Sequence, residues 1–304
     1  MNATFHRIWN SDLVWSWRHS PVAIIATIMT LVLFIGALGS TWLAPFDPFD
    51  LASINLMDAL KPPAWSEDGE MPYFLGTDSQ GRDLFSALLY GTRTSLLIGL
   101  ASVLLAMLVG IVLGLIAGYA GGRLDAFIMR VADVQLSFPA ILIALLIDGV
   151  ARAVFPLSMH ETIAFPVLIG AIALAGWPQY ARTVRGSTLV EKNREYVQAA
   201  KVIGVSAPRI MFSHVLPNVL GPVLILATVH LATAIITEAT LSFLGVGVPP
   251  TSPSLGTLIR IGNDFLFSGE WWITIFPGLM LVLLVLSVNL LGDWLRDALN
   301  PKLN

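Results

Sequence analysis

The sequence has 304 residues, of which 56% are hydrophobic and only 12% are charged, and its mean hydropathy is +0.77. Soluble domains carry about a quarter charged residues, so the composition excludes an ordinary soluble domain and predicts an integral membrane protein. The net charge of -3 predicts no nucleic-acid partner, and the lack of cysteine excludes disulfides, thiolate metal sites and cysteine nucleophiles.

Hydrophobic segments long enough to cross a bilayer occur six times in the chain. A helix needs about 20 mostly apolar residues for this. We therefore predict an all-α membrane protein whose six transmembrane helices lie at about 22–44, 95–118, 126–148, 162–181, 218–240 and 273–292. The first of them lacks a small-x-small cleavage site, so it is interpreted as an uncleaved span.

The basic residues indicate the orientation of these spans. One alternating set of loops holds 12 of the 17 basic residues, which are Arg7, Arg18, Arg123, Arg130, Arg182, Arg185, Lys192, Arg194, Lys201, Arg209, Arg296 and Lys302. Since loops rich in Lys and Arg stay in the cytoplasm, both termini are expected there. This gives a cytoplasmic arm at 1–21, an extracytoplasmic segment at 45–94, a five-helix core at 95–292 and a cytoplasmic tail at 293–304.

The loop at 182–217 is the longest and most basic segment on the predicted cytoplasmic side. Good helix formers predict a helix from about Ser187 to Ile203. Gly204 follows at the position where helices commonly end in a left-handed residue.

A second, short helix is expected after this bend. Ser206 can cap it, Pro208 lies in its first turn, and Pro217 marks the entry to the next span. Its apolar residues, Ile210, Met211, Phe212 and Val215, would form a ridge, and Ala199 and Ala200 would form a flat patch. Such a surface suits either a groove on a soluble partner or, as a basic interfacial helix, anionic lipid.

The spacing of this loop resembles a known motif. Gln198-Ala199-Ala200, then Gly204, then Leu216-Pro217 matches the spacing of the Glu-Ala-Ala ("EAA") loop of ABC-importer permeases. Two positions depart from that motif, because Gln198 replaces the Glu and His214 replaces the usual Ile. Neither change removes the glycine bend or the small patch.

Four further stretches extend the resemblance over nearly the whole chain. They are "LGTDSQGRDLFSALLYGTRTSL" (75–96), "GLIAGYAGGRLD" (114–125), "EATLSFLGVGVPPTSPSLG" (238–256) and "NLLGDWLRDALNPKL" (289–303). Together they look like the second permease of dipeptide, oligopeptide and nickel importers, although Ala87 stands where relatives often have Arg.

The resemblance implies a type I ABC-importer permease in a bacterial inner membrane. It further implies a homologous second permease, two ATPase subunits that bind ATP and Mg, and an extracytoplasmic solute-binding protein. The EAA loop would be the coupling helix that contacts an ATPase, through Gln198, Ala199, Ala200, Gly204, Arg209, Leu216 and Pro217. The implied substrate is a di- or oligopeptide, with a nickel chelate or another small solute as the alternative.

Other functional classes lack their signatures in this sequence. No Gly-x-x-x-x-Gly-Lys-Ser/Thr is present, so ATP is expected on another polypeptide and no cofactor is expected in this chain. "MHETIA" has Ala164 where the zinc-protease motif has its second histidine, and Gly-x-Ser-x-Gly is absent, so no catalytic role is predicted. A self-sufficient secondary transporter would favour charged or unwound segments at mid-membrane, whereas the span centres here are nearly uncharged.

A stripe of small residues marks the second span. Gly110, Gly114 and Gly118 lie on one helical face, where small residues let membrane helices approach closely. The face could pack within this subunit, against the partner permease, or along the pathway.

Polar residues near the spans give further expectations. Thr77 or Asp78 is expected to cap an interfacial helix that carries Leu84, Phe85, Leu88 and Leu89, on a segment that could also contact a binding protein. Asp133 is expected to pair with Arg130, and "VPPTSPSLG" is expected to form a rigid turn.

Two ionisable residues fall in the fifth span. Glu238 lies about 30 Å along a helix from Pro217 and so at the outer mouth, where it could cap or gate. His230 lies deeper and is interpreted as a buried, satisfied histidine.

Overall fold

The structure is a computed structural model that describes residues 12–50 and 54–298. Arg7, Lys302 and the ends of the predicted arm and tail lie outside the described residues. Within them the chain is helical, with no strand beyond one isolated bridge. The elements are α2 (Asp12–Arg18), α3 (Pro21–Leu38), α4 (Ser40–Leu43), η1 (Leu56–Asp58), α5 (Leu84–Ala120), α6 (Gly122–Leu136), α7 (Ala140–Val154), η2 (Leu157–Met159), α8 (His160–Glu191), α9 (Glu195–Val202), α10 (Ala207–Ile210), η3 (Met211–Val215), α11 (Leu216–Phe243), α12 (Leu255–Asn263), η4 (Leu266–Ser268) and α13 (Trp272–Ala298).

Five helical segments of the described chain are long and apolar enough to cross a membrane, or six if the bent pair α6–α7 is one span. The predicted spans at 22–44, 95–118, 162–181, 218–240 and 273–292 each overlap one of the five. Several helices extend well beyond the predicted limits, because a helix does not have to end where its apolar stretch ends.

The predicted third span at 126–148 is wrong as a single helix. It consists of α6 and α7, which meet at an angle of 92°. Pro139 at the break has no N–H to donate, and its ring disfavours helical backbone at Phe138. The chain therefore turns sharply after Leu136 even though the hydrophobic stretch continues.

The start of α5 also differs from expectation. Asp83, not Thr77 or Asp78, is the N-cap, and its carboxylate accepts hydrogen bonds from the Ser86 backbone N–H at 2.8 Å and from the Ser86 hydroxyl at 2.6 Å. The predicted interfacial helix is therefore the first part of α5 itself, which runs on for 37 residues.

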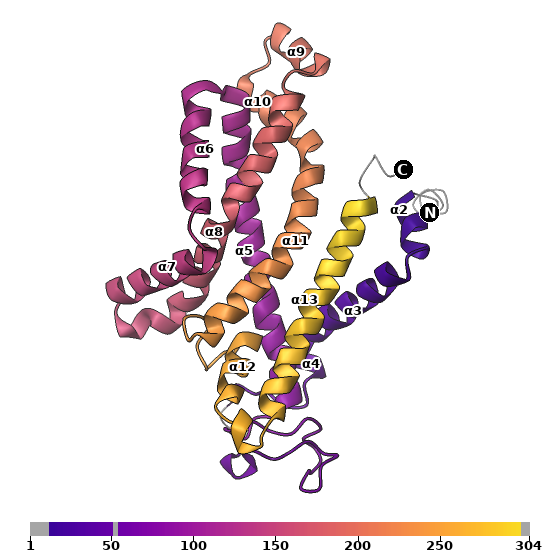
Figure 1. Cartoon of the computed structure of the whole chain (residues 1–304), viewed down its shortest axis with the longest axis vertical. Coiled ribbons are helices and arrows are strands. Elements are labelled where there is room, and N and C mark those ends of the chain that lie inside the picture. Colours follow the sequence, from indigo (N-terminus) through magenta and orange to yellow (C-terminus); the bar gives the residue numbers. More distant parts are fainter. Residues whose placement is uncertain (1–11, 51–53, 299–304) are drawn as a thin grey trace.

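The helices form an elongated bundle, with short helices and loops at its two ends (Figure 1). α5 packs along α8, while α11 contacts α5, α8 and α13, and α3 packs on α13 and α5. α9 and α10 lie at one end of the bundle, and the loop before α5 lies with α12 at the other. The ends of α2 and α13 near the termini point toward the α9 end (Figure 1).

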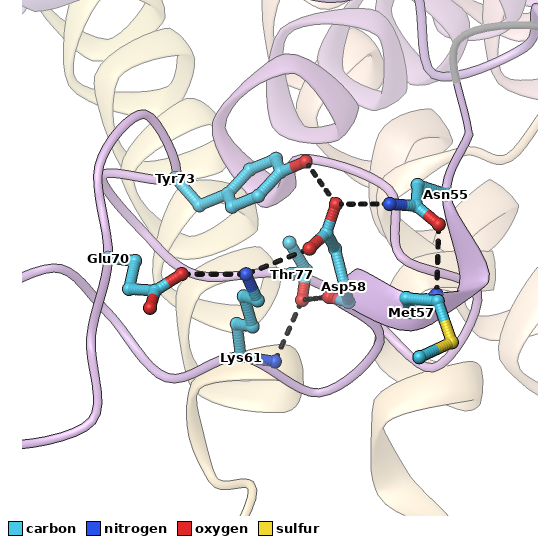
Figure 2. Close-up of polar contacts among 7 residues, drawn as sticks. All are labelled: Asn55, Met57, Asp58, Lys61, Glu70, Tyr73 and Thr77. Atoms are coloured by element: carbon cyan, nitrogen blue, oxygen red, sulfur yellow. Dashed lines mark hydrogen bonds and ion pairs between the residues drawn. The ribbon is translucent and has the colours of Figure 1, made fainter.

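The loop before α5 is held together by side-chain bonds rather than by regular elements (Figure 2). The Asp58 carboxylate accepts hydrogen bonds from Asn55 at 3.0 Å and from the Tyr73 hydroxyl at 3.1 Å, and it pairs with Lys61 at 2.8 Å. Lys61 also pairs with Glu70 at 2.8 Å. The Lys61 ammonium lowers the pKa of Asp58, and the two carboxylates raise the pKa of Lys61.

A buried ion pair joins this loop to the segment before α12. Arg82 Nε donates to Asp78 Oδ2 at 2.6 Å, and the two side chains are only 4% and 1% exposed. Arg82 Nη1 reaches the Pro250 carbonyl at 3.5 Å, whereas Nη2 has no partner within the described chain. The proline-rich segment that was expected to form a rigid turn is thus fixed to the loop before α5, and Ser254 then caps α12.

Candidate functional site

The polar end of the bundle is built from the end of α8 and from α9 and α10. The single helix predicted from Ser187 to Ile203 is wrong, because α8 ends at Glu191 and α9 begins at Glu195. At this break the Asn193 side chain donates to the Leu189 carbonyl and the Gln198 side chain donates to the Lys192 carbonyl, both at 3.0 Å. These amides satisfy carbonyls that the interrupted helix leaves free.

The bend after α9 has the left-handed residue that the sequence predicts. Gly204 has a φ of +83°, a backbone conformation that strains L side chains. Its N–H bonds to the Lys201 carbonyl and the Val205 N–H bonds to the Ala200 carbonyl, both at 3.0 Å. This pair of hydrogen bonds is the Schellman motif, which closes the helix end and fixes the bend.

The second short helix does not end at Pro217. Ser206 is at the N-cap position of α10, although its side chain makes no capping bond, and α10 continues through the π-helical turn η3 into α11. Pro217 lacks an N–H and its ring crowds the preceding turn, so a wider turn just before it relieves the conflict. The segment Ala207–Phe243 is therefore one continuous helix that starts in the polar loop.

Side-chain bonds tie the loop to the transmembrane helices. The Tyr196 hydroxyl donates to Glu191 Oε2 at 2.6 Å and accepts from Asn218 Nδ2 at 3.0 Å. Burial, reinforced by Glu191, raises the pKa of Tyr196. Lys192 Nζ donates to the Gly118 carbonyl of α5 at 2.7 Å. The loop is thus attached to α5, α8 and α11 and is not a free tether.

The apolar surface of the loop differs from the predicted ridge. Ile210 and Val215 are buried in the core cluster between α5, α8 and α11, and Ala200 is buried there as well. Of the predicted ridge, Phe212 remains 50% exposed, but the most exposed apolar residues of the loop are Val202 and Ile203, at 90% and 79% exposure, which we call the apolar tip.

The remaining residues of the predicted coupling surface differ in their exposure. Gln198, Ala199 and Arg209 are exposed, Leu216 packs against the core cluster, and Pro217 is exposed. Sequence reasoning missed the tip itself and the anchors Lys192, Tyr196 and Asn218. Two consecutive large apolar residues just before the helix-ending glycine were the one available signal for the tip.

The glycine stripe of α5 lies against α8. A Cβ on Gly110 would lie 2.3 Å from Tyr180 Cβ, one on Gly114 would lie 2.6 Å from the Ala181 carbonyl oxygen, and one on Gly118 would lie 2.7 Å from Thr188 Cβ. Such distances leave no room for a side chain, so the stripe is occupied by packing within this chain.

Glu238 is fully buried near the end of α11 that faces α12. Its carboxylate accepts hydrogen bonds from the hydroxyls of Ser95 and Ser242, each at 2.7 Å. The Ser95 hydroxyl oxygen also accepts from the Leu255 N–H at 3.2 Å. Glu238 thus links α5, α11 and the start of α12.

Asp133 does not pair with Arg130 as expected. It forms an ion pair with Arg182 of α8, so it joins two helices rather than two turns of α6. This partner could not be read from sequence spacing, since the two residues are far apart in the chain.

Comparison with known proteins identifies the family. The family described as "Binding-protein-dependent transport system inner membrane component" matches residues 110–304. The chain belongs to this permease family.

Curated relatives agree with the family assignment. The chain is 42% identical over 288 residues to the dipeptide transport system permease protein DppC of Escherichia coli (strain K12), covering 94% of this chain and 91% of that one. It is 40% identical to the di/tripeptide transport system permease protein DppC of Pseudomonas aeruginosa (strain UCBPP-PA14), covering 95% and 90%. A probable D,D-dipeptide permease of E. coli K12 is 35% identical, with 96% and 91% covered.

A solved structure supports the fold of the permease. An inward-facing structure of the MetNI methionine ABC transporter aligns with a TM-score of 0.55 and 20% identity, over 70% of this chain and 96% of that one. The all-α permease fold and the family resemblance expected from the sequence are therefore confirmed, and the protein is a multi-pass inner-membrane component.

Proposed function

We propose that this permease is one half of the membrane pathway of an ATP-driven importer for di- and oligopeptides. A homologous second permease would supply the other half, two cytoplasmic ATPases would bind ATP and Mg, and an extracytoplasmic binding protein would deliver the solute. Support for the substrate class comes from three relatives, 35–42% identical over nearly the whole chain, whose names specify di- or tripeptides.

The observation that carries the proposal is the apolar tip on an anchored loop. Val202 and Ile203 are almost fully exposed, while the residues beneath them are bonded to three transmembrane helices. Burying such a side chain against a partner contributes about 1.5–3 kcal/mol. We place this end of the bundle and both termini in the cytoplasm, where the tip, Gln198, Ala199 and Arg209 would occupy a cleft on an ATPase.

The path from this contact into the membrane is short. Beyond Gly204 the chain enters the continuous helix Ala207–Phe243, whose outer end carries the buried Glu238. We propose that Glu238, by holding α12 against α5 and α11, belongs to an outer gate. Movement imposed on the loop by the ATPases would then reach this gate through one helix.

The test is a double substitution at the tip, Val202→Glu with Ile203→Glu. We expect the variant to insert normally, because neither side chain packs within the chain, but to lose co-purification with the ATPases and ATP-dependent dipeptide uptake in reconstituted vesicles. Val190→Glu, at an exposed apolar position in the last turn of α8, is the matched control and should retain both.

Three results would contradict the proposal. Full ATPase retention and uptake by the double variant would exclude the tip as the contact. Uptake of a nickel chelate but not of dipeptides would overturn the substrate class. Solute accumulation by the purified chain alone on an ion gradient would indicate a secondary transporter.

A further inference from the structure

A cavity with a mostly apolar lining and four polar residues lies between α8 and α11, roughly halfway along both helices. Its volume is about 200 Å³, and its polar lining comes from Gln179 of α8 and from His230, Thr233 and Thr237 of α11. The three α11 residues follow a helical spacing that places them on one face. With His230 neutral, no residue that lines the cavity carries a formal charge.

The His230 ring is held in one orientation. Its Nδ1 lies 3.0 Å from the hydroxyl of Tyr180, a fully buried residue whose hydroxyl has no other partner in the described part of the chain. We assign the buried phenol as the donor of this bond, which makes Nδ1 the acceptor and places the imidazole proton on Nε2. The Cε1–Nε2 edge of the ring packs closely on Gly176, where an added Cβ would lie 2.2 Å from His230 Cε1 and 2.6 Å from Nε2.

The other lining groups present acceptors. The Thr233 hydroxyl donates to the His230 carbonyl at 2.9 Å and the Thr237 hydroxyl donates to the Thr233 carbonyl at 2.8 Å. Both hydroxyl oxygens therefore keep lone pairs for a ligand. The exposed Gln179 amide forms no side-chain bond among the described residues and can both donate and accept.

Polar groups that keep unused hydrogen-bonding capacity are not stable against lipid. Polar side chains within spans face a bundle interior or a water-filled cavity, because hydrocarbon offers them no hydrogen-bond partner. The face formed by Gln179, His230, Thr233 and Thr237 is therefore expected to lie toward protein or water rather than lipid, as the wall of a solute pathway would.

We propose that this cavity binds the main-chain amides of the transported peptide. His230 Nε2–H would donate to a peptide carbonyl, while the Thr233 and Thr237 oxygens would accept from peptide N–H groups. An uncharged set of one fixed donor and two acceptors fits a peptide group better than a charged metal chelate. The inference rests on the proposed peptide-importer function and assigns that function a contact site within this chain.

Cysteine accessibility tests the site directly, because the chain contains no native cysteine. Thr233→Cys and Thr237→Cys would be introduced singly into the complete importer and labelled with a water-soluble methanethiosulfonate reagent. We expect both cysteines to react, and to react several-fold more slowly while L-alanyl-L-alanine is transported with ATP. Thr228→Cys is the matched control, since Thr228 also bonds its own helix but faces Gly292 of α13; it should show no protection.

Substitution of the donor gives a second measurement. His230→Leu should lower the dipeptide uptake rate about 2–10-fold, the value of one hydrogen bond, and His230→Gln should restore much of it. If the wild-type importer transports the dipeptide but neither cysteine is protected, or His230→Leu is fully active, the inference fails and the proposed function stands. If the wild-type complete importer does not transport dipeptides, the proposed function fails first.

Discussion

Asp78 and Arg82 illustrate how much one buried charge depends on its partner. Both side chains are nearly inaccessible, and the Nη2 amino group of Arg82 already lacks an acceptor in the described chain. Removing the carboxylate would leave a guanidinium in a low-dielectric site with only the Pro250 carbonyl to compensate it. Such uncompensated charges are among the most destabilising defects in proteins.

We therefore expect Asp78→Ala to lower the free energy of unfolding by about 3–5 kcal/mol. The measurement is titration of the purified permease with denaturing detergent in mixed micelles. Asp148→Ala is the control, because Asp148 and Arg152 form a pair with the same spacing in which Arg152 is 47% exposed. That substitution should cost about 0–1 kcal/mol, and equal losses at the two sites would contradict the argument.

The contact between α5 and α8 depends on the glycines of α5. Their spacing predicts close helix packing, but it does not predict which helix packs there. At Gly114 a Cβ would lie 2.6 Å from the Ala181 carbonyl and 2.7 Å from Val184 Cβ, so the helices would have to move apart. Gly170 of α8 has no atom within 4 Å of the same position.

Gly114→Ala should accordingly destabilise the permease by about 1–3 kcal/mol through overpacking. Gly170→Ala should be neutral or stabilising by about 0.4–1 kcal/mol, because alanine restricts the unfolded chain. The same detergent titration measures both. A destabilised Gly170→Ala with an unaffected Gly114→Ala would contradict the close-packing argument.

Hydrophobicity was enough to locate most of the transmembrane helices, but not to show where they bend. The five long spans follow from runs of apolar residues, since a bilayer imposes their length. The break between α6 and α7 occurs inside such a run, and its signal was the local restriction that Pro139 places on Phe138. A hydropathy average over about 20 residues does not detect the effect of a single proline, so the span was predicted as one straight helix.

The loop shows the same division between local and non-local information. The bend at Gly204 follows from a residue preference that acts within one turn, and it was predictable. Which apolar residues stay exposed depends on packing against α5 and α8, so Ile210 and Val215 were wrongly expected on the surface. The partners of Lys192 and Asp133 likewise come from distant parts of the chain.

For the molecule as a whole, the bend at Gly204 decides how α9 is set relative to the long helix that follows. Gly204→Pro forces φ to about -65°, against the observed +83°, and should abolish coupling while leaving membrane insertion intact. Gly204→Asn is the control, because asparagine tolerates the left-handed region. Uptake in vesicles and ATPase co-purification are the measurements.

Retained uptake together with full ATPase binding in Gly204→Pro would show that the fixed bend is not needed. Loss of uptake and of ATPase binding in Gly204→Asn would show that the position tolerates no side chain, whatever its backbone angle. The expected pattern is loss in the first variant and retention in the second.

The uninterrupted helix from Ala207 to Phe243 has a geometric consequence. Its 37 residues extend about 55 Å, so a tilt of only about 10° around one end displaces the other by about 10 Å. A displacement of that size is comparable to the width of an extended peptide with its side chains. In the proposed importer, a small swing of this helix at the ATPase end would therefore be large enough to open a passage at its other end.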